Sequence, residues 1–120
     1  MSDPAGTAGT VLRLSSRQEG DARILSVSGQ LTETECAEFL DALNKEFDSG
    51  APRLVLDLAG LQYMSSAGLG AVVSAHKRFA DADRKMILAG ANVRVHKLLT
   101  LTSLDRLILT AASAQEALEL

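Results

Sequence analysis

Apolar positions along this chain follow two different periods, and the change of period marks out the predicted elements. Residues 11–16 and 22–28 alternate between apolar and polar side chains, which is typical of strands with one buried face. The turn-forming segment Glu-Gly-Asp at 19–21 separates them, so the two strands are predicted to pair as a hairpin.

The other predicted strands are runs of consecutive apolar residues, which indicate strands covered on both faces. They lie at 54–56, 86–89 and 107–109. Asp57 is expected to end the first of these strands. A short loop is then predicted to cross the carboxyl edge of the sheet before the next helix.

Helical periodicity fills the segments between the strands, and it is clearest over 36–47. Thr32 and Glu35 precede that segment with the Ser/Thr-x-x-Glu spacing of a capping box, so a helix is expected to begin there. The further predicted helices cover 67–80, 93–101 and 113–120, the last opened by Ser113 and Glu116 with the same spacing.

An alternation of strands and helices requires crossover connections, and these join parallel strands. We therefore predict an α/β fold with a mixed sheet. Its central strands are parallel, an N-terminal antiparallel strand forms one edge, and the helices lie mainly on one face. Residues 1–10, rich in Ser, Gly and Ala, are expected to form a flexible tail, and residues 11–120 a single domain.

Composition narrows the classes of function. The 120 residues are 47% hydrophobic, enough for one core, and the net charge of -3 leaves no basic excess for direct nucleic-acid binding. No secretory signal and no run of about 18 apolar residues is present, so membrane insertion is not expected. The single cysteine, Cys36, excludes an internal disulfide and is expected to be a packing residue. These features predict a cytoplasmic protein whose surface serves a protein partner.

The candidate chemistry lies in two serines, Ser65 and Ser66, at the predicted start of the helix over 67–80. A hydroxyl at that position lies at the positive end of the helix dipole, beside backbone N–H groups that can receive a phosphate. Phosphorylation adds roughly -1.5 to -2 charges at neutral pH, which is enough to abolish a docking contact without refolding the domain. The pattern favours a phosphorylation switch.

The segment 57–70, DLAGLQYMSSAGLG, resembles the signature of STAS domains, the family of sulfate-transporter tails and bacterial anti-sigma factor antagonists. The resemblance continues to the end of the chain and covers about 11–120. In the antagonists, a histidine-kinase-like serine kinase, commonly the anti-sigma factor itself, phosphorylates a Ser or Thr at this turn. A PP2C-type phosphatase reverses the modification, and the unphosphorylated form binds the anti-sigma factor.

The turn departs from the family pattern, which often reads Asp-Ser-Ser-Gly or Asp-Ser-Thr-Gly. The matching residues here are Ser65, Ser66, Ala67 and Gly68, so the acid and the second hydroxyl are both replaced. Some members of the family carry a single hydroxyl at the place of Ser66. The resemblance therefore makes Ser66 the first-choice phosphorylation site and Ser65 the second, with helix capping as the simpler role for Ser65.

The resemblance also implies a docking surface for the kinase around this turn and along the next helix. Its predicted members are Gln62, Tyr63, Met64, Ser65, Ser66, Ala67, Gly68, Lys77 and Arg78. Tyr63 and Met64 contact a partner if exposed, or pack against the first helix if buried. Gly70, like Gly68, permits either close approach of the kinase or helix-to-sheet packing. Asp57, at the carboxyl edge of the sheet, either orients Ser66 or a bound nucleotide group, or hydrogen-bonds loop backbone.

Enzyme motifs are weak in this sequence. Gly68 and Gly70 supply half of a dinucleotide fingerprint, and no Walker lysine follows them. His76 and His96 are isolated, so neither metal spacing nor a hydrolytic base is recognised; His76 is expected to be partly buried and His96 solvated. No catalytic residue, metal or cofactor is expected. Two alternatives stay open: a STAS protein without phosphorylation, acting as an accessory subunit of a transport ATPase or a signalling scaffold, and a nucleotide-binding module at the strand ends.

Overall fold

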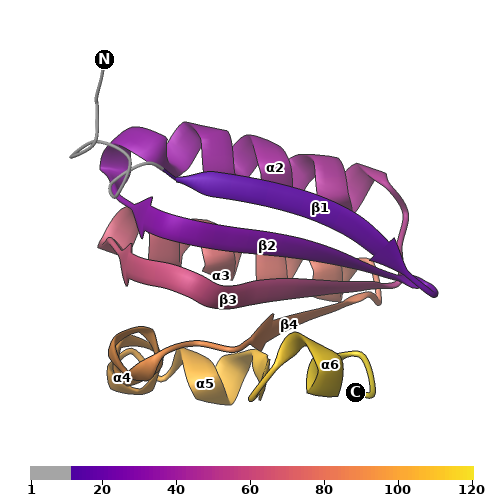
Figure 1. Ribbon diagram of the computed structural model, residues 1–120. Coiled ribbons are helices and arrows are strands. Elements are labelled where there is room, and N and C mark those ends of the chain that lie inside the picture. The colour runs from indigo at the N-terminus through magenta and orange to yellow at the C-terminus, as the bar shows by residue number, and fades with distance from the viewer. Residues whose placement is uncertain (1–11) are drawn as a thin grey trace.

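A five-stranded sheet forms the centre of the computed structural model, which describes residues 12–120 (Figure 1). The strands lie in the order β1-β2-β3-β4-β5. β1 pairs antiparallel with β2, and the three later pairs are parallel. The strands are β1 (Arg13–Glu19), β2 (Ala22–Leu31), β3 (Arg53–Met64), β4 (Lys85–Ala89) and β5 (Leu109–Ala111). The predicted mixed sheet with an antiparallel edge strand is confirmed, whereas the predicted tail at 1–10 lies outside the described residues.

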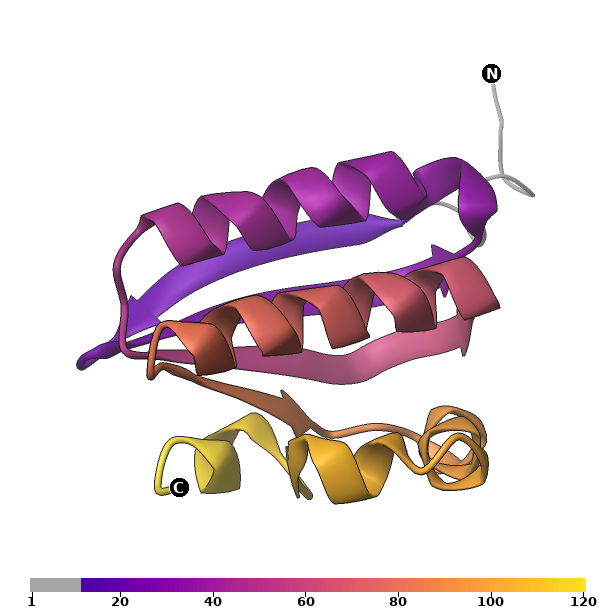
Figure 2. The ribbon, with the colours of Figure 1, turned by 180° about the vertical axis from the view of Figure 1, so that it is seen from behind.

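Helices cover the two faces of the sheet unequally. Figure 2 shows α2 (Cys36–Asp48) and α3 (Ser66–Asp81) lying side by side across one face. On the opposite face, Ala117 packs against Ile24, Val55 and Ile87. The shorter elements are η1 (Glu33–Glu35), α4 (Val93–Leu101), α5 (Leu104–Leu107) and α6 (Ala114–Ala117). The prediction of helices mainly on one face is therefore confirmed.

The consecutive apolar run at the start of β3 serves both faces, as predicted. Leu54 and Leu56 belong to the large core beneath α2 and α3, and Val55 belongs to the smaller cluster beneath α6. Phe39 of α2 and Phe79 of α3 are almost completely buried in the larger core. Truncating a phenylalanine of this kind to alanine typically costs about 3–5 kcal/mol, so α2 and α3 are firmly fixed to the sheet.

β3 is longer than the sequence predicted, and the expectation that Asp57 ends it is wrong. The pairing of β3 with β4 ends at Asp57. β3 itself continues to Met64, and over this second half it pairs with β2 alone. Two register shifts each place an extra residue on β3. As a result, the buried residues Leu58, Leu61 and Met64 recur every three positions, and this spacing hides the alternation that identifies a strand.

A very close approach between β2 and β3 accompanies the first register shift. A Cβ added to Gly60 would lie 2.6 Å from the Cβ of Ser28, which no real pair of carbons tolerates. Glycine at 60 therefore lets the two strands stay paired where β3 bends.

Other boundaries shift by a few residues. β5 begins at Leu109, because the preceding residues 104–107 form α5. The helix predicted over 67–80 begins one residue earlier, at Ser66. The last helix begins as predicted, because Ser113 Oγ accepts from the N–H of Glu116 at 3.2 Å as an N-cap.

Within residues 12–120, no helix combines the length and apolar character needed to cross a membrane.

The chain leaves β2 through the predicted Thr32–Glu35 cap. The N–H of Thr32 donates to Glu35 Oε1 at 3.0 Å, and the Thr32 hydroxyl donates to the same oxygen. The hydroxyl first, and then the N–H, hold the pKa of Glu35 below its ordinary value of 4.5. The predicted capping box forms, although its first turn is η1 and the α-helix starts at Cys36.

Replacing Gly60 by alanine is expected to destabilise the fold by about 1–3 kcal/mol, because the new methyl group overpacks against Ser28. Urea unfolding measures the change. The Ser28→Gly substitution removes the clashing carbon, so the double variant should be more stable than the sum of the two single changes predicts. Gly70→Ala, whose Cβ has nothing within 4 Å, is the control and is expected to stabilise by up to about 1 kcal/mol. Strict additivity at 28 and 60 would contradict the close contact.

Glu35→Gln is expected to lower the Tm at pH 7. A carboxyl whose pKa is lowered by folding contributes stability that is fully present above its unfolded pKa and is lost as the pH falls through the folded pKa. The Tm difference between wild type and variant should therefore shrink as the pH is lowered below 4.5. Glu33→Gln removes the same charge two residues earlier and is the control, since the Glu33 side chain makes no hydrogen bond within residues 12–120. A pH-independent difference would overturn the assignment.

Candidate functional site

Ser65 begins α3 from a nearly buried position, 9% exposed. Its backbone is extended, and its Oγ accepts from the N–H of Gly68 at 3.2 Å. Its own N–H donates to the carbonyl of Leu31, at the end of β2, at 2.9 Å. The Ser65 hydroxyl is thus engaged as an N-cap, and its backbone fixes the start of α3 to the sheet.

Ser66 is the first residue of α3 and its side chain is exposed. Within residues 12–120, its hydroxyl makes no hydrogen bond to another side chain or to backbone. The first N–H groups of a helix lack intrahelical partners, and here Ser65 already occupies the one on Gly68. Two adjacent serines therefore differ in kind: one hydroxyl is used by the fold, and the other faces solvent.

The two glycines of this turn have different surroundings. A Cβ on Gly68 would lie 2.8 Å from Leu31 Cδ2 and 2.9 Å from Met64 Cγ, whereas one on Gly70 would meet nothing within 4 Å. Gly68 therefore permits close packing of α3 on the sheet. Gly70 is exposed, and packing on the sheet does not require a glycine there.

A groove of about 370 Å³ opens beside Ser66, between the end of β3 and α4. One wall consists of Gln62, Tyr63, Met64 and Ser66, and the other consists of Arg94, Val95 and Leu98. Tyr63 is 49% exposed at the rim, whereas Met64 is 3% exposed and belongs to the core. Of the two readings open for these residues, exposure holds for Tyr63 and burial for Met64.

Asn92 holds the second wall in place. Its Nδ2 donates to the carbonyl of Leu61 on β3 at 2.9 Å, and its Oδ1 accepts from the N–H of Val95 at 2.9 Å as the N-cap of α4. α4 consequently lies beside the end of β3 (Figure 1). The sequence prediction missed this wall. Asparagine directly before a helical segment is a cap signal that identifies Asn92, but nothing local identifies its bond to β3.

Lys77 and Arg78 lie at the opposite end of α3, about 16–18 Å from Ser66 along the helix axis. Arg78 Nη1 donates to Asn44 Oδ1 at 2.6 Å, and its guanidinium lies 4.1 Å from the ring centre of Phe47. Both residues are exposed, and Arg78 is in addition engaged with α2. The structure does not bring these two cations to the serine turn.

Asp57 is also remote from the turn. Its Oδ1 accepts from the N–H of Ala59 at 3.1 Å, and Met64 lies seven positions further along extended β3, at roughly 3.3 Å per residue. The backbone role weighed for Asp57 matches this geometry, and an orienting contact with Ser66 does not.

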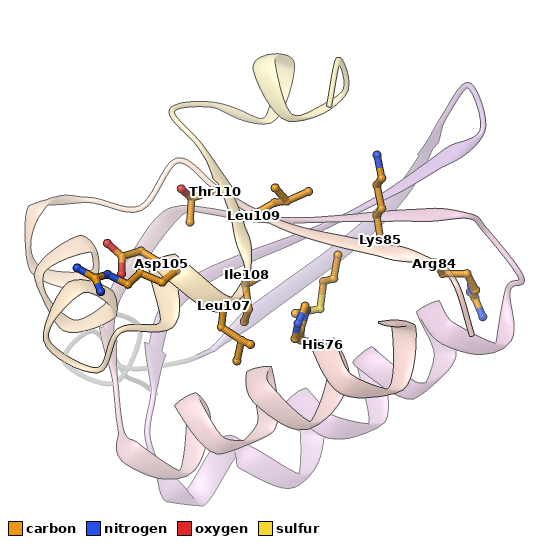
Figure 3. Close-up of a pocket in the computed structure, with 10 residues that line it drawn as sticks. His76, Arg84, Lys85, Asp105, Leu107, Ile108, Leu109 and Thr110 are labelled. Carbon is orange, nitrogen blue, oxygen red and sulfur yellow. The ribbon is translucent and has the colours of Figure 1, made fainter. Parts of the chain in front are cut away.

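A second cavity of about 380 Å³ lies between α3 and the segment from α5 to β5 (Figure 3). His76, half-buried, rises into it from α3, while Lys85 and Asp105 lie at opposite sides. These charged groups do not converge on one point. Among the described residues, no three His, Cys, Asp or Glu side chains group closely enough to hold a metal ion.

Residues 13–117 match the family model of the STAS domain. The chain belongs to the STAS domain family. The match spans every strand and helix described above, from β1 to α6.

Solved structures share this fold at low sequence identity. A candidate anti-sigma factor antagonist from Thermotoga maritima is 24% identical with a TM-score of 0.83, covering 88% of this chain and 92% of that one. An anti-sigma factor antagonist from Mycobacterium paratuberculosis is 17% identical with a TM-score of 0.86, covering 91% and 92%. The Bacillus cell fate determinant SpoIIAA, in its phosphorylated form, is 16% identical with a TM-score of 0.69, covering 91% and 97%. At these identities the likeness is one of fold.

Ser65→Ala is expected to destabilise the domain by about 1 kcal/mol, because it removes the N-cap of α3. Ser66→Ala should change stability by no more than about 0.5 kcal/mol, as is usual for an exposed side chain without partners. Urea unfolding of the two variants measures both values. Equal losses, or a larger loss at Ser66, would contradict the division of roles between the serines.

Proposed function

We propose that this chain is a cytoplasmic anti-sigma factor antagonist that acts by binding and not by catalysis. It binds a histidine-kinase-like anti-sigma factor while Ser66 is unmodified and is released when that kinase phosphorylates Ser66. A PP2C-type phosphatase then restores the binding form. The observation that carries the proposal is the exposed, unengaged hydroxyl of Ser66 at the start of α3 in a STAS domain.

Accessibility supports Ser66 over Ser65 as the acceptor. A kinase must place the acceptor oxygen in line with the γ-phosphorus of ATP, so that the phosphoryl group passes to Ser66 Oγ while ADP and one proton leave. An exposed residue at the first turn of a helix meets this need. Ser65 would first have to give up its bond to Gly68 and its near-complete burial.

The exposed residues around the turn suit protein docking. Gln62 and Tyr63 are exposed beside Ser66, and tyrosine is among the residues enriched at the centres of interfaces. In the groove next to them, Met64, Val95 and Leu98 supply apolar surface, which we call its floor, and a partner side chain can pack against it. We therefore place the docking surface on the rim and walls of this groove. Lys77 joins it only for a partner that extends along the whole of α3.

Phosphate on Ser66 would release the partner through charge. Roughly -1.5 to -2 charges would appear inside the contact, and desolvating an unmatched charge costs several kcal/mol. Since the fold does not use the Ser66 side chain, this change needs no refolding.

Ser66→Asp is expected to weaken binding to the cognate kinase about tenfold or more, which corresponds to about 1.4 kcal/mol or more, and Ser66→Ala to leave it within about twofold. The experiment incubates the purified chain with each histidine-kinase-like serine kinase of its host and Mg-ATP, and follows modification by intact mass and affinity by calorimetry. Wild type and Ser65→Ala should gain one phosphate, and Ser66→Ala none. A phosphate that persists in Ser66→Ala, or equal affinity of the two Ser66 variants, would overturn the switch.

Ala67, at the place of the family's usual acceptor, favours one other candidate function. A STAS protein that never uses phosphorylation would bind a transport ATPase or a signalling scaffold through the same surface. In that case none of the host's serine kinases would modify the chain, and purified wild type and Ser66→Asp would bind the ATPase or scaffold equally.

A further inference from the structure

Arg94 and Ser66 line the same groove. The two residues belong to opposite walls of the same cavity of about 370 Å³, Ser66 at the start of α3 and Arg94 at the second position of α4. Arg94 is exposed, and its guanidinium forms no hydrogen bond or ion pair with any side chain or carbonyl of residues 12–120. The charge of Arg94 is therefore free to act inside the groove.

The residues that line the groove carry charge of one sign only. Arg94 is the one charged residue among its lining residues, and the phenol of Tyr63 is the one other titratable group there. Met64, Val95 and Leu98 supply apolar surface, which favours strong pairing of any charges that enter. No carboxylate lines the groove to neutralise the arginine.

The backbone of both walls is held rigidly. Val95 and Leu99 of α4 are each 1% exposed in the core, and Asn92 ties the start of α4 to β3. On the other wall, Ser65 is bonded to β2. The separation of the two helices is thus set by packing, whereas the exposed side chain of Arg94 has no partner within residues 12–120 that would hold it in one position.

We propose that the groove is a binding site for a phosphomonoester of the same chain, in which Arg94 binds the phosphate of phosphorylated Ser66. The inference rests on the proposed function, because it concerns the modified form of the same serine. A guanidinium can bind two phosphate oxygens at once, in a geometry that an ammonium group cannot reproduce. The phosphate then occupies the floor that a partner side chain would use, and the one positive charge of the groove is neutralised.

This contact gives the release two components. Repulsion by the phosphate acts on the partner directly, and filling of the groove removes the apolar floor from the docking surface. The contact with Arg94 also stabilises the phosphorylated form. A phosphatase must therefore separate the phosphate from Arg94 before it hydrolyses the phosphoester. Neither Lys77, at the far end of α3, nor the separated charges of the second cavity offer Ser66 an equivalent partner.

The experiment places phosphoserine at 66 by genetic encoding, which needs no kinase, and titrates the phosphate by ³¹P NMR. An arginine in contact lowers the second pKa of the phosphate, so Arg94→Gln should raise it by about 0.5–1 unit relative to wild type. Lys97→Gln is the matched control, because it removes one positive charge from the same helix outside the groove. Arg94→Lys should give an intermediate value, since it keeps the charge and loses the two-pronged contact.

A second readout separates contact from long-range charge. The Nε–H signal of Arg94 should shift and become protected from exchange with water in the chain with phosphoserine at 66, relative to the chain with serine at 66, and the Ser66→Ala chain should resemble the latter. The same pKa in wild type, Arg94→Gln and Lys97→Gln would overturn the contact and leave the kinase-driven switch intact. Failure of all kinases to modify Ser66 would overturn the switch, and the encoded phosphoserine would still decide the contact.

Discussion

The long pairing of β2 with β3 is the constraint on which the rest of the site depends. β4 leaves β3 at Asp57, but β2 stays paired as far as Met64 through two register shifts and the close approach at Gly60. This ladder carries the chain past the body of the sheet to the point where Ser65 bonds to Leu31. A strand ending at Asp57 would have started α3 roughly 20 Å earlier along the sheet, at about 3.3 Å per residue, with neither β2 nor α4 beside the serines.

The site combines two demands that one residue cannot meet. The start of α3 has to be capped and buried for the helix to pack, yet the hydroxyl that the proposed switch requires has to stay exposed and unengaged. Ser65 and Ser66 divide these tasks, because extended backbone at Ser65 directs its side chain inward and the first helical turn directs Ser66 outward. The replacement of the family's usual acid by Ser65 is understandable in this light, since a serine caps the helix as effectively as an aspartate does.

Much of this architecture could be predicted from the sequence, because it depends on local patterns. Alternating and consecutive apolar runs located the strands, and the capping spacing at Thr32 located the start of the first helix. The second half of β3 could not be predicted, since its buried residues follow a period of three that only the bulged pairing with β2 explains. The second wall of the groove was hidden for a related reason. It depends on a bond between Asn92 and the carbonyl of Leu61, 31 residues apart, and no pattern near Arg94 reveals which strand α4 lies against.

A rigid domain with a groove of one charge sign can serve as a switch without changing its fold. Packing fixes the two walls, so the groove offers the same apolar floor and the same guanidinium to whatever enters it. A partner side chain and the protein's own phosphate would compete for that volume, and the phosphate has the advantage of being covalently attached at the rim. Because the phosphate is linked covalently to Ser66, its effective concentration in the groove does not depend on diffusion from solution. Under this mechanism phosphorylation acts by occupying the groove, and the domain does not have to change its fold.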